Sequence, residues 1–155
     1  MGRRLFHRRA RVTAAIAVIA TAGGAAIAVI ANDSAAAGTL QPSALLAVAN
    51  AAAARSGDAT PTAIYMSALT TRSAANMTAS QDTIPTVSGG NNPAYLIVER
   101  GNFTLSNAQG VTTGPEPTGT VLTLVVDAGT GQVTDGGVQD VMPNLAALGT
   151  TTQLR

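Results

Sequence analysis

An apolar run without charged residues lies near the start of the chain and constrains its organisation more than any other feature. Residues 12–31 read VTAAIAVIATAGGAAIAVIA, and a helix of this length rises about 30 Å, which matches the hydrocarbon thickness of a bilayer. Five arginines precede the run, at positions 3, 4, 8, 9 and 11. Because cytoplasmic flanks carry an excess of basic residues, the sequence predicts a cytoplasmic basic segment at residues 1–11, a transmembrane helix at residues 12–31 and an extracytoplasmic remainder.

The same segment also has the features of a removable export signal. Residues 35–37 are three alanines, and they offer an A-x-A cleavage site just before Gly38. Arg3 and Arg4, followed by Phe6, resemble the start of a twin-arginine export signal. Cleaved signals have apolar stretches of about 7–15 residues, which are shorter than this one. The sequence therefore favours a retained anchor and leaves open a secreted protein.

The part of the chain from Gly38 onward contains no histidine, cysteine or lysine, since the only histidine is His7. The usual activating bases for a serine nucleophile, amine catalysis and zinc or copper sites are therefore missing. Carboxylates remain, but Asp127, Asp135 and Asp140 lack the regular spacing of a calcium loop. The sequence thus predicts a protein that is not an enzyme, with no catalytic residue, cofactor or metal.

The same part of the chain is acidic. From Gly38 it has four arginines and seven Asp or Glu residues, a net charge of −3, and it contains no tryptophan. Nucleic acid binding relies on basic surfaces and aromatic stacking platforms, so nucleic acid is not expected as a partner. The expected partners are the lipid bilayer, through residues 12–31, and a protein or peptide.

A tether and an amphipathic helix should follow the apolar run. Residues 32–42 are small and polar, which is typical of a tether. The segment SALLAVANAAAARSG then predicts a helix with Ser43 as its N-cap and Gly57 just beyond its C-terminus. One face of this helix is apolar and needs a sheet to cover it: Leu45, Val48, Ala49 and Ala52.

Three later segments have the composition and alternation of strands. They are TAIYMSALTTR at 62–72, AYLIVER at 94–100 with a continuation through Leu105 left open, and TVLTLVVD at 120–127. A terminal hairpin should complete the sheet.

The connections should be long, because residues 73–93 and 106–119 are rich in Gly, Pro, Asn, Ser and Thr. The segment PNLAALG at 143–149 predicts one helical turn. We therefore expect an α+β domain over residues 43–155, with one helix on a sheet of about three or four antiparallel strands.

The hairpin sequence VVDAGTGQVTD at 125–135 is the stretch that looks most like a site. Asp127 runs into an Ala-Gly-Thr-Gly tip, where glycines supply positive φ and an aspartate accepts hydrogen bonds from the turn. A phosphate loop would need a lysine and a following helix, and an aspartic protease would need a second matched aspartate loop. We therefore interpret Asp127 as a turn residue.

A helix, then strands, then a closing hairpin resembles the PepSY type of small extracytoplasmic domain. The residues that carry the resemblance are Val126, Asp127, Thr130, Gly131 and Val133. The resemblance covers residues 43–138. It implies one helix layer on one antiparallel sheet, and a role in restraining peptidases or in sensing in the cell envelope, but it assigns no site residues.

The chain as a whole is also similar to small membrane-linked proteins of actinobacteria. These observations together predict a membrane-tethered, envelope-facing binding or regulatory module. An accessory structural subunit of a membrane complex and a secreted protein are the alternatives.

Overall fold

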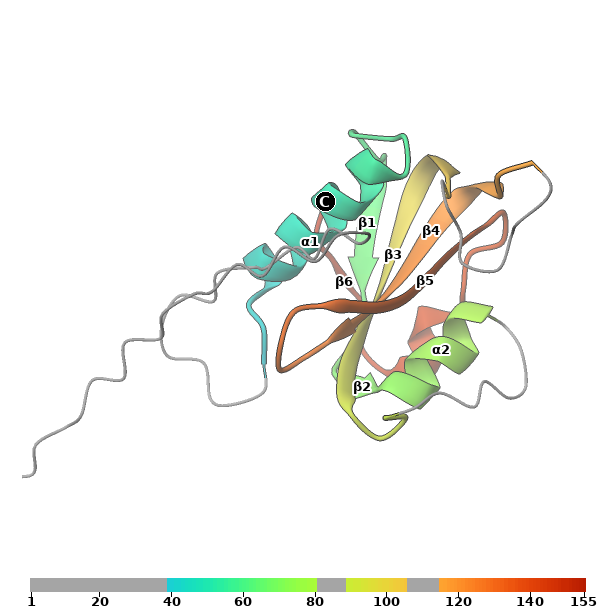
Figure 1. Cartoon of the computed structure of the whole chain (residues 1–155). Helices are drawn as coiled ribbons and strands as arrows, with labels where there is room; N and C mark the ends of the chain where they lie inside the picture. Colours follow the sequence, from blue (N-terminus) through green and yellow to red (C-terminus); the bar gives the residue numbers. More distant parts are fainter. Residues whose placement is uncertain (1–38, 81–88, 106–114) are drawn as a thin grey trace, which may run out of the picture.

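The computed structural model describes residues 39–80, 89–105 and 115–155. They form a six-stranded antiparallel sheet with helices on both faces (Figure 1). The helical elements are α1 (Pro42–Arg55), α2 (Arg72–Ser80) and the 3-10 turn η1 (Leu145–Leu148). The strands are β1 (Ala63–Met66), β2 (Thr70–Thr71), β3 (Pro93–Thr104), β4 (Thr118–Asp127), β5 (Val133–Gln139) and β6 (Thr152–Gln153).

The strand order is β5-β4-β3-β1-β6, and β2 also pairs with β3. β3 is long enough to serve two partners on one side. Its start pairs with β2, where Thr70 lies opposite Ala94, and its middle pairs with β1, where Met66 lies opposite Ile97. On its other side β3 pairs with β4 along most of its length. β5 lies at one edge of the sheet and β6 at the other.

Alternate side chains of β3 enter two separate hydrophobic cores, one on each face of the sheet. The core beneath α1 includes Leu45, Val48, Ile64, Ile97, Phe103 and Leu124. The core beneath α2 and η1 includes Ala75, Ala79, Leu96, Val98, Val125 and Leu145. Because both faces are covered, β3 and β4 read as nearly continuous apolar runs rather than as polar–apolar alternations.

The first predicted helix is confirmed, together with its apolar face. It begins at Pro42 with Gln41 at the N-cap position, so the prediction of Ser43 as the N-cap is wrong by two residues, and Ser43 lies in the first turn. Proline suits the first turn of a helix because its missing N–H would have no partner there. Gly57 has a φ of +90° and follows the helix, as expected for a glycine that ends one.

The prediction of a single helix on one face is wrong, since α2 occupies residues 72–80, which include the first eight residues of the loop expected at 73–93. Thr71 caps the helix by accepting the N–H of Ala74 at 3.2 Å. Ala75 and Ala79, four residues apart, are then buried against the sheet. The part of the predicted loop at residues 81–88 lies outside the described residues.

The expected strand at 62–72 is interrupted. β1 ends at Met66, β2 covers only two residues, and α2 begins at Arg72. At the interruption, Ser67 keeps the chain attached to β3: its N–H donates to the carbonyl of Leu96 at 2.9 Å, and its hydroxyl accepts the N–H of Leu96 at 3.0 Å. The Ser67 side chain is fully buried, so the kink is part of the core.

Six strands replace the expected three or four, partly because β2 and β6 are only two residues long. The continuation of the middle strand is confirmed to Thr104, and the helical turn near the C-terminus is confirmed as η1 followed by Gly149 at φ +103°. The second predicted loop, at residues 106–119, overlaps the start of β4 at Thr118, and its residues 106–114 lie outside the described residues. The predicted span at residues 12–31 lies outside the described residues, and within them no helix is long and apolar enough to cross a membrane.

Candidate functional site

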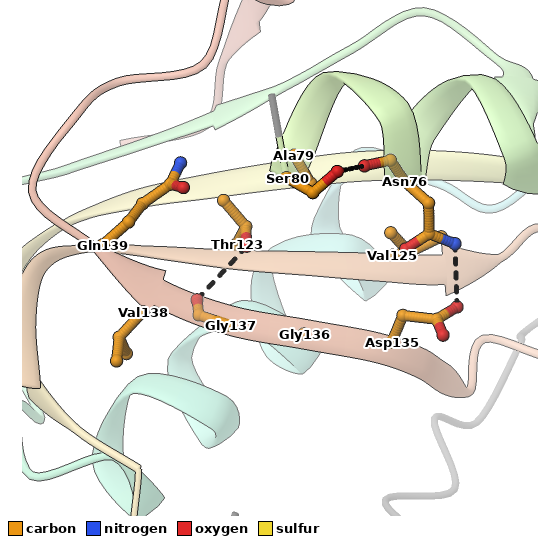
Figure 2. A pocket seen from close by; sticks show the side chains of 10 residues that line it. All are labelled: Asn76, Ala79, Ser80, Thr123, Val125, Asp135, Gly136, Gly137, Val138 and Gln139. Atoms are coloured by element: carbon orange, nitrogen blue, oxygen red, sulfur yellow. Dashed lines mark hydrogen bonds between the residues drawn. The ribbon is translucent and has the colours of Figure 1, made fainter. Parts of the chain in front are cut away.

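An open groove of about 550 Å³ lies between α2 and the edge strand β5. Thr123 and Val125 of β4 form its floor, and α2 forms one wall (Figure 2). The other wall is the backbone of β5 from Asp135 to Gln139. The groove exists because α2 is short and reaches β5 only near Asp135, so the rest of this strand has no helix above it.

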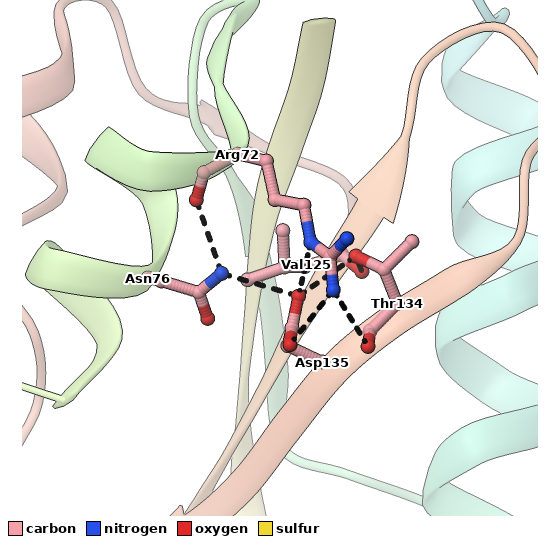
Figure 3. A network of polar contacts seen from close by, with 5 residues as sticks. All are labelled: Arg72, Asn76, Val125, Thr134 and Asp135. Atoms are coloured by element: carbon pink, nitrogen blue, oxygen red, sulfur yellow. Dashed lines mark hydrogen bonds and ion pairs between the residues drawn. The ribbon is translucent and has the colours of Figure 1, made fainter. Parts of the chain in front are cut away.

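A polar network closes one end of the groove and joins α2 to β5 (Figure 3). The Arg72 guanidinium donates to both carboxylate oxygens of Asp135, from Nε to Oδ2 at 2.7 Å and from Nη2 to Oδ1 at 3.1 Å. Asn76 Nδ2 and the Thr134 hydroxyl also donate to Asp135 Oδ2, at 3.1 and 2.9 Å. Paired hydrogen bonds from one guanidinium fix the geometry more firmly than a single ionic contact would.

The network keeps Asp135 ionised. Burial opposes ionisation, but the hydrogen bonds from Arg72, Asn76 and Thr134 outweigh it and lower the pKa of the Asp135 carboxyl. The hydrogen bond to Asp135 likewise raises the pKa of Arg72. A carboxylate held in this way is a structural link and is a poor general acid or base near neutral pH.

The far end of the groove is marked by Gln139 (Figure 2). Its Nε2 is buried and has no hydrogen-bond partner within the part of the chain that the structure describes. Between the two ends, the Thr123 hydroxyl donates to the carbonyl of Gly137 at 3.2 Å. The groove therefore presents a backbone wall and a floor that includes the apolar side chain of Val125.

A smaller groove of about 250 Å³ lies on the opposite face of the same strand, beside the end of α1. Its apolar lining includes Leu122, Leu124 and Val133. Gly136 and Gly137 line both grooves. Because two consecutive residues of the edge strand have no side chain, its backbone is accessible from both faces at the same point.

The structure does not bring the three candidate carboxylates into one site. Asp127 Oδ1 accepts the N–H of Gly129 at 3.0 Å and that of Thr130 at 2.8 Å, as expected for a turn residue. Asp135 is held by α2, and Asp140 accepts the N–H of Thr120 at 3.1 Å. Among the described residues, no group of three or more His, Cys, Asp or Glu side chains could hold a metal ion.

A buried carboxyl, Glu99, lies on the other face of the sheet, beneath α1. Its cross-strand neighbours are Ile64 on β1 and Leu122 on β4, and its side chain is fully buried. Neither carboxylate oxygen has a hydrogen-bond partner within residues 39–80, 89–105 and 115–155. Burial, with a smaller contribution from Asp58, raises the pKa of Glu99 to about 8. Glu99 lines neither groove.

Sequence reasoning missed the groove because it missed α2, which carries Arg72 and Asn76. Two signals were present in the sequence. Thr71 has the chemistry of an N-cap, and Ala75 and Ala79 are spaced four apart, as residues on one helical face are. The surrounding Asn, Ser and Thr residues, which favour loops, obscured both signals.

Comparison with known proteins finds no family model, no curated protein and no solved structure that matches the chain.

Proposed function

We propose that this protein is a non-enzymatic binding or regulatory module that residues 12–31 tether to the membrane, with its domain outside the cytoplasm. The observation that carries the proposal is the edge strand β5, which has an open groove on each face and two glycines where the grooves meet. Exposed sheet edges beside grooves are surfaces on which proteins bind extended segments of a partner.

The chemistry around the groove supports binding rather than catalysis. Its one carboxylate, Asp135, is ion-paired with Arg72, and the chain from Gly38 onward has no histidine, lysine or cysteine. The resemblance of the hairpin to PepSY-type domains supports the same class of function, because those domains are associated with peptidase restraint or envelope sensing.

Site-specific photo-crosslinking in the producing cell would test the function. A photoreactive residue at Gly137 lies in the groove, whereas the same residue at the exposed Ala54 of α1 serves as the control. We expect a discrete protein or peptide adduct from position 137 and none from position 54. Equal adducts at both positions, or none at either, would contradict a binding role for β5.

The tether needs a separate measurement. Intact-mass analysis of membrane and secreted fractions should find the full-length chain in the membranes. A species that begins near Gly38 and lies free outside the cell would replace the tethered module with the secreted alternative.

A further inference from the structure

The edge strand β5 lacks most of the features that usually keep a sheet edge from pairing. Its only pairing partner within the described part of the chain is β4, so one side of its backbone faces away from the sheet. Natural edges are commonly protected by outward charges, proline or very short strands. β5 is seven residues long and contains no proline, and its one charged residue, Asp135, is bound to Arg72. Its one irregularity is a β-bulge at Thr134, near its start, and residues 135–139 pair with β4 in regular register.

The fold does not require a glycine at position 137. Gly137 does not have a positive φ, and a Cβ placed there would meet only the Thr123 hydroxyl, at 3.8 Å, which is an ordinary contact. Gly119 on β4 is different, because a Cβ there would lie 2.6 Å from the carbonyl of Gln139. Packing thus explains Gly119, whereas at Gly137 the described residues leave room for a side chain.

The charge of the residues around β5 indicates which kind of partner this edge would bind. Asp135 is ion-paired with Arg72, so the carboxylates of this edge that can attract a partner are Asp127 and Asp140. Asp127 precedes the turn into β5 and Asp140 follows its end, so carboxylates lie near both ends of the edge. The negative potential of these carboxylates favours a cationic partner. A second copy of the chain is disfavoured, because edge-to-edge pairing would bring two acidic hairpins together.

Building on the function proposed above, we infer that β5 binds an extended peptide segment rich in lysine or arginine, which adds to the sheet as a further strand beside the groove under α2. Main-chain hydrogen bonds would supply affinity, and alternate side chains would enter the groove. Gln139 lines the same groove at its far end.

Binding of defined peptides to the full chain in neutral detergent tests the inference. The probe is an eight-residue peptide of alternating valine and lysine. One comparison peptide replaces lysine with glutamate, and another carries N-methyl groups on alternate amides, which removes main-chain donors. We expect the lysine peptide to bind at least about tenfold more tightly than either comparison peptide, and more weakly as salt rises.

Gly137→Val supplies the matched variant, since it fills the groove where space allows a side chain. Thr152→Val on β6 places the same side chain at the opposite, exposed edge. We expect only Gly137→Val to weaken the lysine peptide, by about tenfold or more, with the melting temperatures of both variants within a few degrees of the parent. Melting is measured because it separates lost binding from lost folding.

Each other result overturns the inference. Equal affinity for the lysine and glutamate peptides would refute the charge assignment, and unchanged binding after N-methylation would refute strand addition. A dimer of the chain that Gly137→Val disperses would identify a second copy as the occupant. If photo-crosslinking from position 137 yields an adduct while the lysine peptide fails to bind, the proposed function survives and only the partner chemistry is wrong.

Discussion

The two faces of the sheet hold their helices by different means. α1 is fourteen residues long and buries five of them, including Leu45 and Val48, in the larger core. α2 is nine residues long and buries only Ala75 and Ala79, and the Arg72–Asp135 ion pair fixes its first turn to β5. Apolar packing is strong and leaves no access, whereas a polar link at one end of a short helix leaves a groove. The difference suggests that the α1 face provides most of the stability and the α2 face provides the site.

The largest effect should follow from placing a charge in either core. Leu124 faces α1 and Val98 faces α2, and both are buried. Leu124→Asp and Val98→Asp should each lower the free energy of unfolding by roughly 4 kcal/mol or more. Urea denaturation followed by circular dichroism measures this. Unchanged transitions for both variants would refute the two-core arrangement.

The next largest effect concerns Glu99 and pH. The pKa of Glu99 is about 8 in the folded protein against 4.5 for an exposed glutamate, so the unfolded chain binds fewer protons between these pH values. The contribution of Glu99 to stability should therefore be fully present below pH 4.5 and should decrease by roughly 4 kcal/mol as pH rises to about 8.

Glu99→Gln should remove that slope, because the amide does not titrate. No histidine, cysteine or lysine follows Gly38, so few other groups of the domain titrate between pH 5 and 9. Denaturation of the parent and of Glu99→Gln at a series of pH values measures the difference. If the free energy of unfolding changed with pH in the same way for both proteins, the Glu99 carboxyl would not be buried beneath α1.

A smaller, local effect should follow from breaking the polar link. Arg72→Gln removes the paired hydrogen bonds to Asp135, whose side chain is 26% exposed, and should cost about 1–2 kcal/mol. Amide hydrogen exchange should accelerate in α2 and leave α1 unchanged. A double-mutant cycle with Asp135→Asn isolates the coupling between the two side chains, and a coupling near zero would contradict the role given to this pair.

The same pair also has a pH signature, of opposite sign to that of Glu99. Because the pKa of Asp135 is lowered on folding, its contribution is present above the unfolded pKa and is lost as pH falls through the folded one. The parent should lose this contribution in acid, and Arg72→Gln should show less loss.

The smallest effect is expected at the hairpin tip. Asp127→Asn keeps an oxygen that can accept the N–H groups of Gly129 and Thr130, so the loss should be at most about 1 kcal/mol. Crosslinking from position 137 should decrease only slightly, because the variant removes one of the two carboxylates near the ends of β5. Lost crosslinking with an unchanged melting temperature would show that Asp127 contacts the partner.

The sequence predicted the elements whose signals are local and strong. The apolar face of α1, the long central strands and the turn at Asp127 all follow from periodicity or turn chemistry. It did not predict α2, whose few apolar side chains are alanines among loop-forming residues. It could not predict β2 or β6 either, since two-residue strands are defined by their partners rather than by their own composition. The groove required α2 and the edge position of β5 together, and the second of these is a property of topology.

The position of β1 in the sheet has a consequence for the order of folding. β3, β4 and β5 each pair with a neighbour in sequence, whereas Tyr65 on β1 pairs with Val98 and with Gln153. Contacts between residues so far apart in the chain form slowly, because the intervening loop must first be closed. We therefore expect the β3–β4–β5 meander to be the folding nucleus. Although α1 and β1 precede it in the chain, they can pack only after it has formed. During that interval the apolar face of α1 is uncovered and depends on its surroundings for protection from aggregation.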